Sequence, residues 1–190
     1  MALLTDRFTQ ALAFAAELHR EQIRKGSGVP YVGHLLGVAS LALDYGADED
    51  EAIAALLHDA IEDQGGAAAR AEIRRRFGDR VTEIVDGCTD AEVIPKPPWR
   101  ERKEAHLRHL TVATPSVRLV SAADKLHNAL CILRDYRTKG EPLWERFRGG
   151  KDGTLWYYRA LVATFDAVGP ADLAAELHRT VAEIETLAAP

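Results

Sequence analysis

Residues 56–63, with the sequence L-L-H-D-A-I-E-D, place four ionisable groups at the end of an apolar segment. His58 and Asp59 could supply one nitrogen and one oxygen ligand to a divalent metal ion, and Glu62 and Asp63 could then position or deprotonate a water molecule. On a single helix these side chains are three or four residues apart and converge at its end. Three carboxylates there would oppose the helix macrodipole unless a cation gathered them. We therefore favour a metal site over the alternative, a solvated acidic helix end.

Two other segments contain candidate ligands. His34 lies in an expected helix whose other inward positions are apolar, where a single histidine is more often a core residue than a ligand. Asp124 lies in a segment otherwise suited to burial, and burying a lone carboxylate is costly without a counter-charge or a metal. A pair between Asp124 and an arginine is the alternative. Together with His58 and Asp59, these residues complete a mixed nitrogen and oxygen set that suits an octahedral ion such as Mn²⁺ with positions left for water.

Basic and amide side chains are candidate contacts for an anionic ligand. Arg24 and Lys25 begin a glycine-containing loop that could bring positive charge and backbone donors to a nucleotide. The loop lacks the GxxxxGK[ST] pattern of a P-loop, and a basic helix end is favourable for dipole reasons alone, so both interpretations stand. Asn128 follows Asp124 by one helical turn and could hold a ligand ring or ribose. The basic segment 99–109 could bind phosphate or form a solvated face.

Hydrophobic residues recur with a period of 3.6 along almost the whole chain, and alternating β-type runs are missing, so we predict an all-α fold. We expect one helical bundle of about eight to ten helices over residues 1–190. The expected helices cover residues 5–24, 31–45, 48–63, 67–77, 79–87, 99–111, 115–136, 154–168 and 170–187. Residues 89–98, which contain three prolines, are expected to form a surface loop.

Composition restricts the class of protein. The chain has 190 residues, 24 Lys plus Arg, 29 Asp plus Glu and a net charge of −5, which argues against a duplex nucleic-acid surface but not against a small phosphorylated ligand. Cys88 and Cys131 are far apart and lack CxxC spacing, so they are expected to be free thiols in a cytoplasmic protein. No signal peptide is recognisable, and no apolar run approaches the roughly 18 residues of a membrane span. We therefore expect a soluble protein without a membrane partner.

Three motifs, taken in order, resemble the hydrolase domain of the RelA/SpoT homologues, most closely the small alarmone hydrolases of the HD superfamily. The motifs are Gln22-x-Arg24-Lys25-x-x-Gly28-x-Pro30-Tyr31-x-x-His34, Leu57-His58-Asp59-x-x-Glu62-Asp63 and Ala123-Asp124-Lys125-Leu126-His127-Asn128. The resemblance covers about residues 8–135. It implies a single all-α HD domain, one Mn²⁺ ion, and removal of the 3′-pyrophosphate from (p)ppGpp to give GDP or GTP and pyrophosphate.

The same resemblance implies a role for ten residues of this chain. The implied metal ligands are His34, His58, Asp59 and Asp124, and the implied water-activating pair is Glu62 and Asp63. The implied nucleotide contacts are Arg24, Lys25, Asn128 and Tyr157. Leu35 and Gln64 stand where the family usually has proline and threonine, and the aromatic segment around Tyr157 also departs from the better-known members.

Other functions remain open at this point. The same reaction on an adenosine alarmone (ppApp) would use the same site. A 5′-nucleotidase or NADPH phosphatase of the HD type would use the same metal set but release inorganic phosphate, and a non-catalytic nucleotide sensor would not need a complete ligand set with Glu62 and Asp63. The sequence also leaves open the preferred purine, the physiological metal and whether the protein forms a homo-oligomer.

Overall fold

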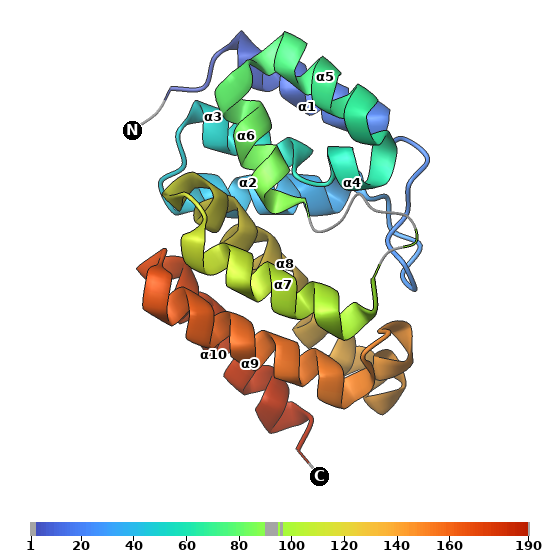
Figure 1. The fold of residues 1–190 in the computed structure, drawn as a ribbon. Coiled ribbons are helices and arrows are strands. Elements are labelled where there is room, and N and C mark those ends of the chain that lie inside the picture. Colours follow the sequence, from blue (N-terminus) through green and yellow to red (C-terminus); the bar gives the residue numbers. More distant parts are fainter. Residues whose placement is uncertain (1–2, 90–94, 96, 190) are drawn as a thin grey trace.

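The computed structural model describes residues 3–89, 95 and 97–189. Within these ranges the chain forms ten α-helices and one short 3₁₀ helix (Figure 1). They are α1 (Asp6–Leu18), α2 (Val32–Asp44), α3 (Glu49–Leu57), α4 (Ala60–Gln64), α5 (Gly66–Phe77), α6 (Asp79–Cys88), α7 (Trp99–Val112), α8 (Pro115–Lys139), η1 (Glu141–Arg146), α9 (Gly150–Val168) and α10 (Ala171–Leu187). The described residues contain no strand beyond an isolated bridge between Ile23 and Pro30. The all-α prediction is confirmed.

Local sequence explains where the helices near the site begin. Asp48 caps α3, and its side chain accepts a hydrogen bond from the Glu51 backbone while the Glu51 side chain accepts one from the Asp48 backbone. This capping box satisfies two backbone donors that the first helical turn would otherwise leave unpaired. The Thr114 side chain caps α8 by accepting a hydrogen bond from the Val117 backbone, and Pro115 follows at the first helical position, where its missing N–H costs nothing. These two residues fix the beginning of α8, which has 25 residues, at Pro115.

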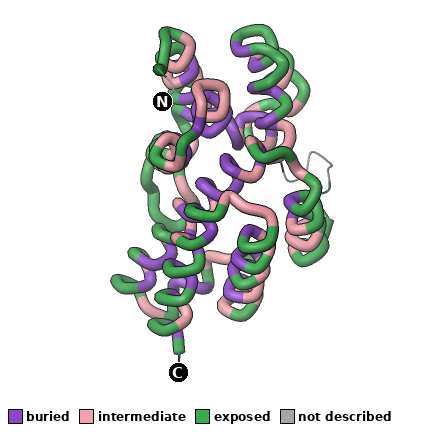
Figure 2. Tube along the Cα trace, turned by 90° about the vertical axis from the view of Figure 1, so that its left-hand side faces the viewer, coloured by how far each residue is buried: buried purple, intermediate pink, exposed green. Residues whose placement is uncertain are grey.

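Helix α8 runs through the middle of the molecule. It packs on α2, α3 and α6 on one side and on α10 on the other, and α1–α6 and α7, α9 and α10 occupy opposite halves of the view in Figure 1. Buried residues face inward along these helices (Figure 2). The fully buried side chains include Leu35, Ile53, Leu56, Leu57 and Leu126. The elements that contain His34, His58 and Asp124 are therefore held in one apolar core.

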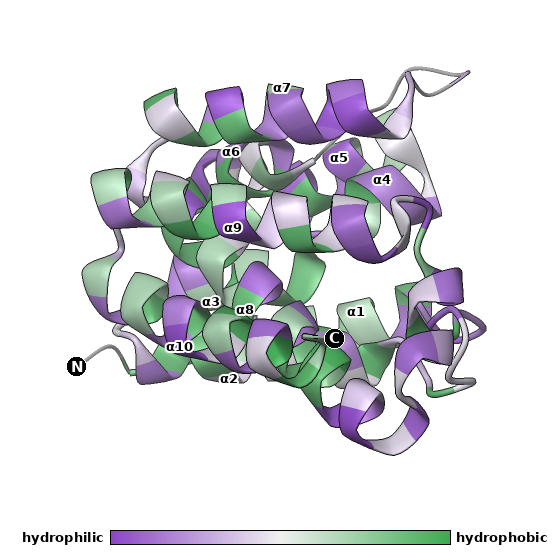
Figure 3. Cartoon of the chain, turned by 90° about the horizontal axis from the view of Figure 1, so that it is seen from below, coloured by the Kyte–Doolittle hydropathy of each residue, from purple (hydrophilic) through white to green (hydrophobic). Residues whose placement is uncertain are grey.

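Helix α7 is different in character from its neighbours. It is largely hydrophilic along its length (Figure 3), and only His106 and Leu110 of its residues are buried. It packs on α9. None of the described helices combines the length and the apolar character needed to cross a bilayer.

The predicted first helix was wrong at its end, because α1 stops at Leu18 rather than continuing to residue 24. The chain instead turns back on itself. Arg24 N donates to Val29 O at 2.8 Å and Tyr31 N donates to Gln22 O at 2.8 Å. These two backbone hydrogen bonds replace the helical ones and form the loop that carries Arg24 and Lys25.

The prediction of one helix over residues 48–63 was also wrong. The chain forms two helices, α3 and α4, and His58 and Asp59 lie at the break between them. The 3₁₀ helix η1 was not predicted. Most of the expected loop over residues 89–98 lies outside the described residues.

Candidate active site

The four candidate metal ligands come from three parts of the fold and meet at one point. His34 is on α2, His58 and Asp59 lie at the α3–α4 break, and Asp124 is on α8. The Nε2 atom of His34 lies 3.2 Å from an Asp124 carboxylate oxygen and 3.7 Å from one of Asp59. His58 Nε2 lies 3.0 Å from the same Asp59 oxygen and 3.7 Å from Asp124. Ligand atoms of His34, His58 and Asp59 all lie within 4.8 Å of one another, as a divalent metal site requires.

The hydrogen bonding of His58 tests whether the residues fit a metal ion. Its Nδ1 lies 2.8 Å from the Ala55 carbonyl, which can only accept, so Nδ1 carries a hydrogen and Nε2 is the nitrogen that faces the site. This Nε2 is buried, and although Asp59 Oδ2 lies 3.0 Å away, it makes no well-aligned hydrogen bond with any described residue. Buried polar atoms without a partner are uncommon, and a backbone carbonyl behind the ring is the usual support of a metal-binding histidine. The donor set therefore fits a divalent cation.

The pKa values of His58, Asp59 and Asp124 also favour a cation at this point. Burial by itself lowers the pKa of His58, but Asp59 and Asp124 outweigh it and raise that pKa to about 9. Burial opposes ionisation of Asp59, yet His58 and His34 hold its pKa well below the usual range. Burial likewise opposes ionisation of Asp124, yet Lys125 and the histidines hold its pKa well below the usual range. The carboxylates of Asp59 and Asp124 are therefore both ionised, and together they favour a positive charge between the four candidate ligands.

Neighbouring side chains fix the two carboxylates. Tyr31 Oη donates to Asp59 Oδ2 at 2.5 Å. Lys125 Nζ donates to Asp124 Oδ2 at 2.6 Å, and Asn128 Nδ2 donates to Asp124 Oδ1 at 2.5 Å. The counter-charge of Asp124 is thus a lysine rather than the arginine that the alternative interpretation required. Such outer contacts orient metal ligands and restrict them to one geometry.

Glu62 and Asp63 both border the site, but not for the reason we expected. They lie in the first turn of α4, where the helix dipole favours negative charge, so the argument from an opposing macrodipole was wrong. It is the break at residues 58–59 that directs all four groups of this segment toward one place. Gln22 Nε2 donates to Asp63 Oδ2 at 2.8 Å. Burial, assisted by the charges of Asp59 and Glu62, raises the pKa of Asp63 above its ordinary value despite this hydrogen bond.

Five of these groups line a cavity of about 230 Å³, namely His34, Asp59, Glu62, Asp63 and Asp124. The same cavity is also lined by Arg102, Lys103 and His106 of α7. The remaining lining residues are Tyr31, Cys88, Lys125 and Asn128. Two of the basic side chains of α7, Arg102 and Lys103, are therefore at the site. Sequence reasoning missed roles for Tyr31 and Lys125, although both lie inside the recognised motifs.

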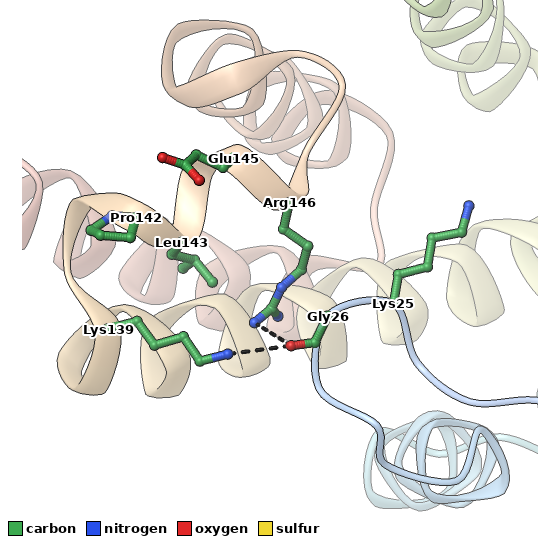
Figure 4. Close-up of a pocket in the computed structure, with 7 residues that line it drawn as sticks. All are labelled: Lys25, Gly26, Lys139, Pro142, Leu143, Glu145 and Arg146. Carbon is green, nitrogen blue, oxygen red and sulfur yellow. Dashed lines mark hydrogen bonds between the residues drawn. The ribbon is translucent and has the colours of Figure 1, made fainter.

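The proposed nucleotide contacts are less well gathered. Arg24 Nη2 donates to Asn128 Oδ1 at 2.7 Å, which brings these two residues together beside Asp124. Lys25 lines a separate cavity of about 430 Å³, where Lys139 and Arg146 both reach the Gly26 carbonyl (Figure 4).

Tyr157 contacts two residues that line the 230 Å³ cavity: Lys103 Nζ lies 5.1 Å from its ring centroid, and the His106 ring centroid lies 6.4 Å away. It is buried among aromatic rings, with ring centroids 6.4 Å from Trp99 and 6.3 Å from Trp156. It is not among the residues that line either cavity. Its role as a nucleotide contact stays a prediction.

Comparison with known proteins relates this geometry to a family. Residues 11–154 match the HD domain model. The guanosine-3′,5′-bis(diphosphate) 3′-pyrophosphohydrolase MESH1 of Xenopus tropicalis is 38% identical over 142 residues, which cover 73% of this chain and 74% of that protein. The human protein of the same name is 35% identical over 142 residues, with the same coverage of both chains.

A solved structure described as a metazoan ortholog of SpoT that hydrolyzes ppGpp matches the fold with a TM-score of 0.78 and 25% identity. The match covers 96% of this chain and 98% of that one. The chain therefore belongs to the HD domain family, and within it to the RelA/SpoT-homologue hydrolases of the small alarmone hydrolase type.

Proposed function

We propose that this protein is a Mn²⁺-dependent hydrolase, a single HD domain over residues 1–190, that removes the 3′-pyrophosphate of (p)ppGpp. The products are GDP or GTP and pyrophosphate. The observation that carries the proposal is the meeting of His34, His58, Asp59 and Asp124 beside one cavity, which Glu62, Asp63 and the cations of α7 also line. The activity printed in the names of the relatives supports the choice of substrate.

The ligands we assign to the ion are His34, His58, Asp59 and Asp124. A set of two nitrogen and two oxygen donors suits Mn²⁺, with positions left for water and a phosphate oxygen. Bound there, the ion would supply Lewis acidity, which lowers the pKa of water and offsets phosphate charge.

The reaction breaks the bond between the ribose 3′-oxygen and phosphorus, and a water molecule adds to that phosphorus. We assign Glu62 and Asp63 to hold this water and to take its proton, since both carboxylates line the cavity and burial raises the pKa of Asp63 toward the range useful for a general base. Arg102 and Lys103, which also line the cavity, offset the negative charge of the pyrophosphate group as water adds to it, and the leaving ribose 3′-oxygen takes up a proton to become the 3′-hydroxyl of GDP or GTP. Arg24, Lys25, Asn128 and Tyr157 are assigned to the nucleoside, with Arg24 and Asn128 already joined by a hydrogen bond.

A product assay tests the proposal. Purified protein with Mn²⁺ is incubated with ppGpp, ppApp, NADPH and a nucleoside 5′-monophosphate, and pyrophosphate and inorganic phosphate are measured separately. We expect pyrophosphate from ppGpp, its loss in Asp59→Ala, and unchanged release in Asp44→Ala, a matched change at an exposed position on α2. The proposal is rejected if no pyrophosphate is released from ppGpp or ppApp. Inorganic phosphate from NADPH or the monophosphate would indicate a phosphatase instead.

We also place the reaction in the cytoplasm. Cys88 and Cys131 are both free, as is usual for proteins of a reducing compartment.

A further inference from the structure

His127 lies on α8, three residues after Asp124, and its ring meets that of His34 on α2. The two Nδ1 atoms are 2.9 Å apart and the ring centroids 4.9 Å. We propose that His127 is a positioning residue that holds His34 in the one tautomer able to bind a metal ion. This inference rests on the metal site of the proposed function.

The location of one hydrogen atom decides whether His34 can bind a metal ion. Two ring nitrogens at 2.9 Å share a single hydrogen, which belongs either to His34 or to His127. His34 presents its other nitrogen, Nε2, to the Asp124 carboxylate at 3.2 Å and to Asp59 at 3.7 Å.

If the hydrogen is on His34 Nδ1, the lone pair of His34 Nε2 faces the site and can coordinate an ion. If it is on His127 Nδ1, neutral His34 must carry its own hydrogen on Nε2, donates it to Asp124 and cannot coordinate. Metal binding therefore requires His127 to accept at Nδ1 and to carry its hydrogen on Nε2.

The helix that contains His34 is shaped to receive this ring. Gly37 lies on α2 three residues after His34, and a Cβ atom at Gly37 would be 2.2 Å from Nε2 of His127. A Cβ at Gly33, on the same helix, would meet nothing within 4 Å. Glycine inside a helix is less favourable than alanine by about 1 kcal/mol. The close approach of the His127 ring is the reason that position 37 cannot easily be larger.

The acceptor for the N–H of His34 is a neutral imidazole, that of His127, and this affects the charge of the site. Most metal-binding histidines donate their second N–H to a carboxylate, a carbonyl or water. A neutral imidazole as acceptor fixes the ring of His34 without adding a third negative charge to a site that already contains Asp59 and Asp124. His127 thus orients the ligand while leaving the charge of the site unchanged.

Titration of the metal-free protein with Mn²⁺ alone, followed by calorimetry, tests the proposal. His127→Phe keeps a ring but cannot accept, and we expect Mn²⁺ binding about 10–100-fold weaker. His127→Gln keeps an acceptor oxygen and should restore most of the affinity. Gly37→Ala should weaken binding by displacing the His127 ring, while Gly33→Ala serves as the matched control with unchanged affinity. Thermal unfolding of each metal-free variant verifies that it is folded.

Two results would overturn the proposal: wild-type affinity in His127→Phe, or equal losses in His127→Phe and His127→Gln, which would indicate packing alone. As a second measurement, ¹⁵N NMR of the histidine rings with diamagnetic Zn²⁺ bound should show His34 protonated on Nδ1 and His127 on Nε2. The opposite assignment also overturns it. Neither experiment contains nucleotide, so failure of pyrophosphate release would reject the proposed function without affecting these outcomes.

Discussion

Arg24 and Asp124 are joined through a single side chain, that of Asn128. Arg24 Nη2 donates to Asn128 Oδ1 at 2.7 Å, and Asn128 Nδ2 donates to Asp124 Oδ1 at 2.5 Å. One amide therefore connects the loop assigned to the nucleotide with a residue assigned to the metal. Mutations at Asn128 and at Arg24 can therefore separate an effect on Mn²⁺ affinity from an effect on the KM for ppGpp.

Replacing Asn128 with alanine removes both hydrogen bonds. We expect Mn²⁺ affinity to fall about tenfold, because Asp124 loses one of its supports, and KM for ppGpp to rise. Arg24→Ala should raise KM while leaving Mn²⁺ affinity close to that of the wild type. Calorimetric titration and steady-state kinetics of both variants measure the two quantities. Unchanged Mn²⁺ affinity in Asn128→Ala would contradict the role given to its amide.

Gln22→Met should lower kcat and shift its pH profile. Asp63 must be ionised to accept a proton, so activity is lost as the pH falls through its raised pKa. Gln22 donates a hydrogen bond to the ionised form, and removing that donor raises the pKa of Asp63 further. The acidic limb of the kcat profile should therefore move to higher pH, by about one unit, with KM little changed. A profile that only loses amplitude would show that Gln22 acts on stability rather than on Asp63.

The ion pair between Asp135 and Arg146 should contribute pH-dependent stability. Their side chains are 13% and 18% exposed, and the Arg146 Nη1 to Asp135 Oδ2 distance is 2.7 Å. Burial opposes ionisation of Asp135, but Arg146 and Arg134 outweigh it and lower its pKa in the folded protein. The stabilisation is therefore present above the unfolded-state pKa of about 3.9 and is lost as the pH falls through the lower folded-state value.

Asp135→Asn should accordingly reduce the free energy of unfolding by about 1 kcal/mol at pH 7. The difference from the wild type should shrink as the pH is lowered below 4. Urea unfolding of both proteins at a series of pH values measures this. A difference that stays constant down to pH 3 would exclude the ion pair as its source.

Phe165→Ala should destabilise the fold without altering the site. Phe165 is fully buried on α9, and truncating a buried phenylalanine costs about 3–5 kcal/mol. Because α9 contains none of the ligands, Mn²⁺ affinity measured well below the unfolding temperature should match that of the wild type. Thermal unfolding and calorimetric titration distinguish the two effects, and a loss of affinity would mean that α9 helps to position the ligands.

Sequence reasoning identified the members of the site better than their arrangement. His58, Asp59, Glu62 and Asp63 stand out because four ionisable groups interrupt an apolar segment, and Asp124 stands out because a carboxylate occurs where burial is expected. Such conflicts between a residue's type and its expected environment can be recognised from the amino-acid sequence alone. The fold class was predictable for a similar reason, since helical periodicity repeats along almost the whole chain.

Features that depend on contacts across the fold were not predictable. The break between α3 and α4 leaves no glycine or proline signal at His58 and Asp59, and it coincides with the contacts of His58 with Asp124 and of Asp59 with Tyr31. The end of α1 depends on backbone bonds that return from residues 29 and 31. The partnership of His127 with His34 joins residues 93 positions apart, and nothing in the spacing of either residue indicates it.

The distribution of the ligands along the chain has a mechanical consequence. His34 and Asp124 lie on different helices and are separated by nearly half of the chain, and neither cysteine forms a disulfide. An ion shared by these residues would act as a removable cross-link that closes this long loop and lowers the conformational entropy of the partly unfolded chain. At an ion concentration one hundred times the Kd, such binding would add about 2.7 kcal/mol to the free energy of unfolding. Resistance to proteolysis would then rise and fall with the supply of metal in the cell.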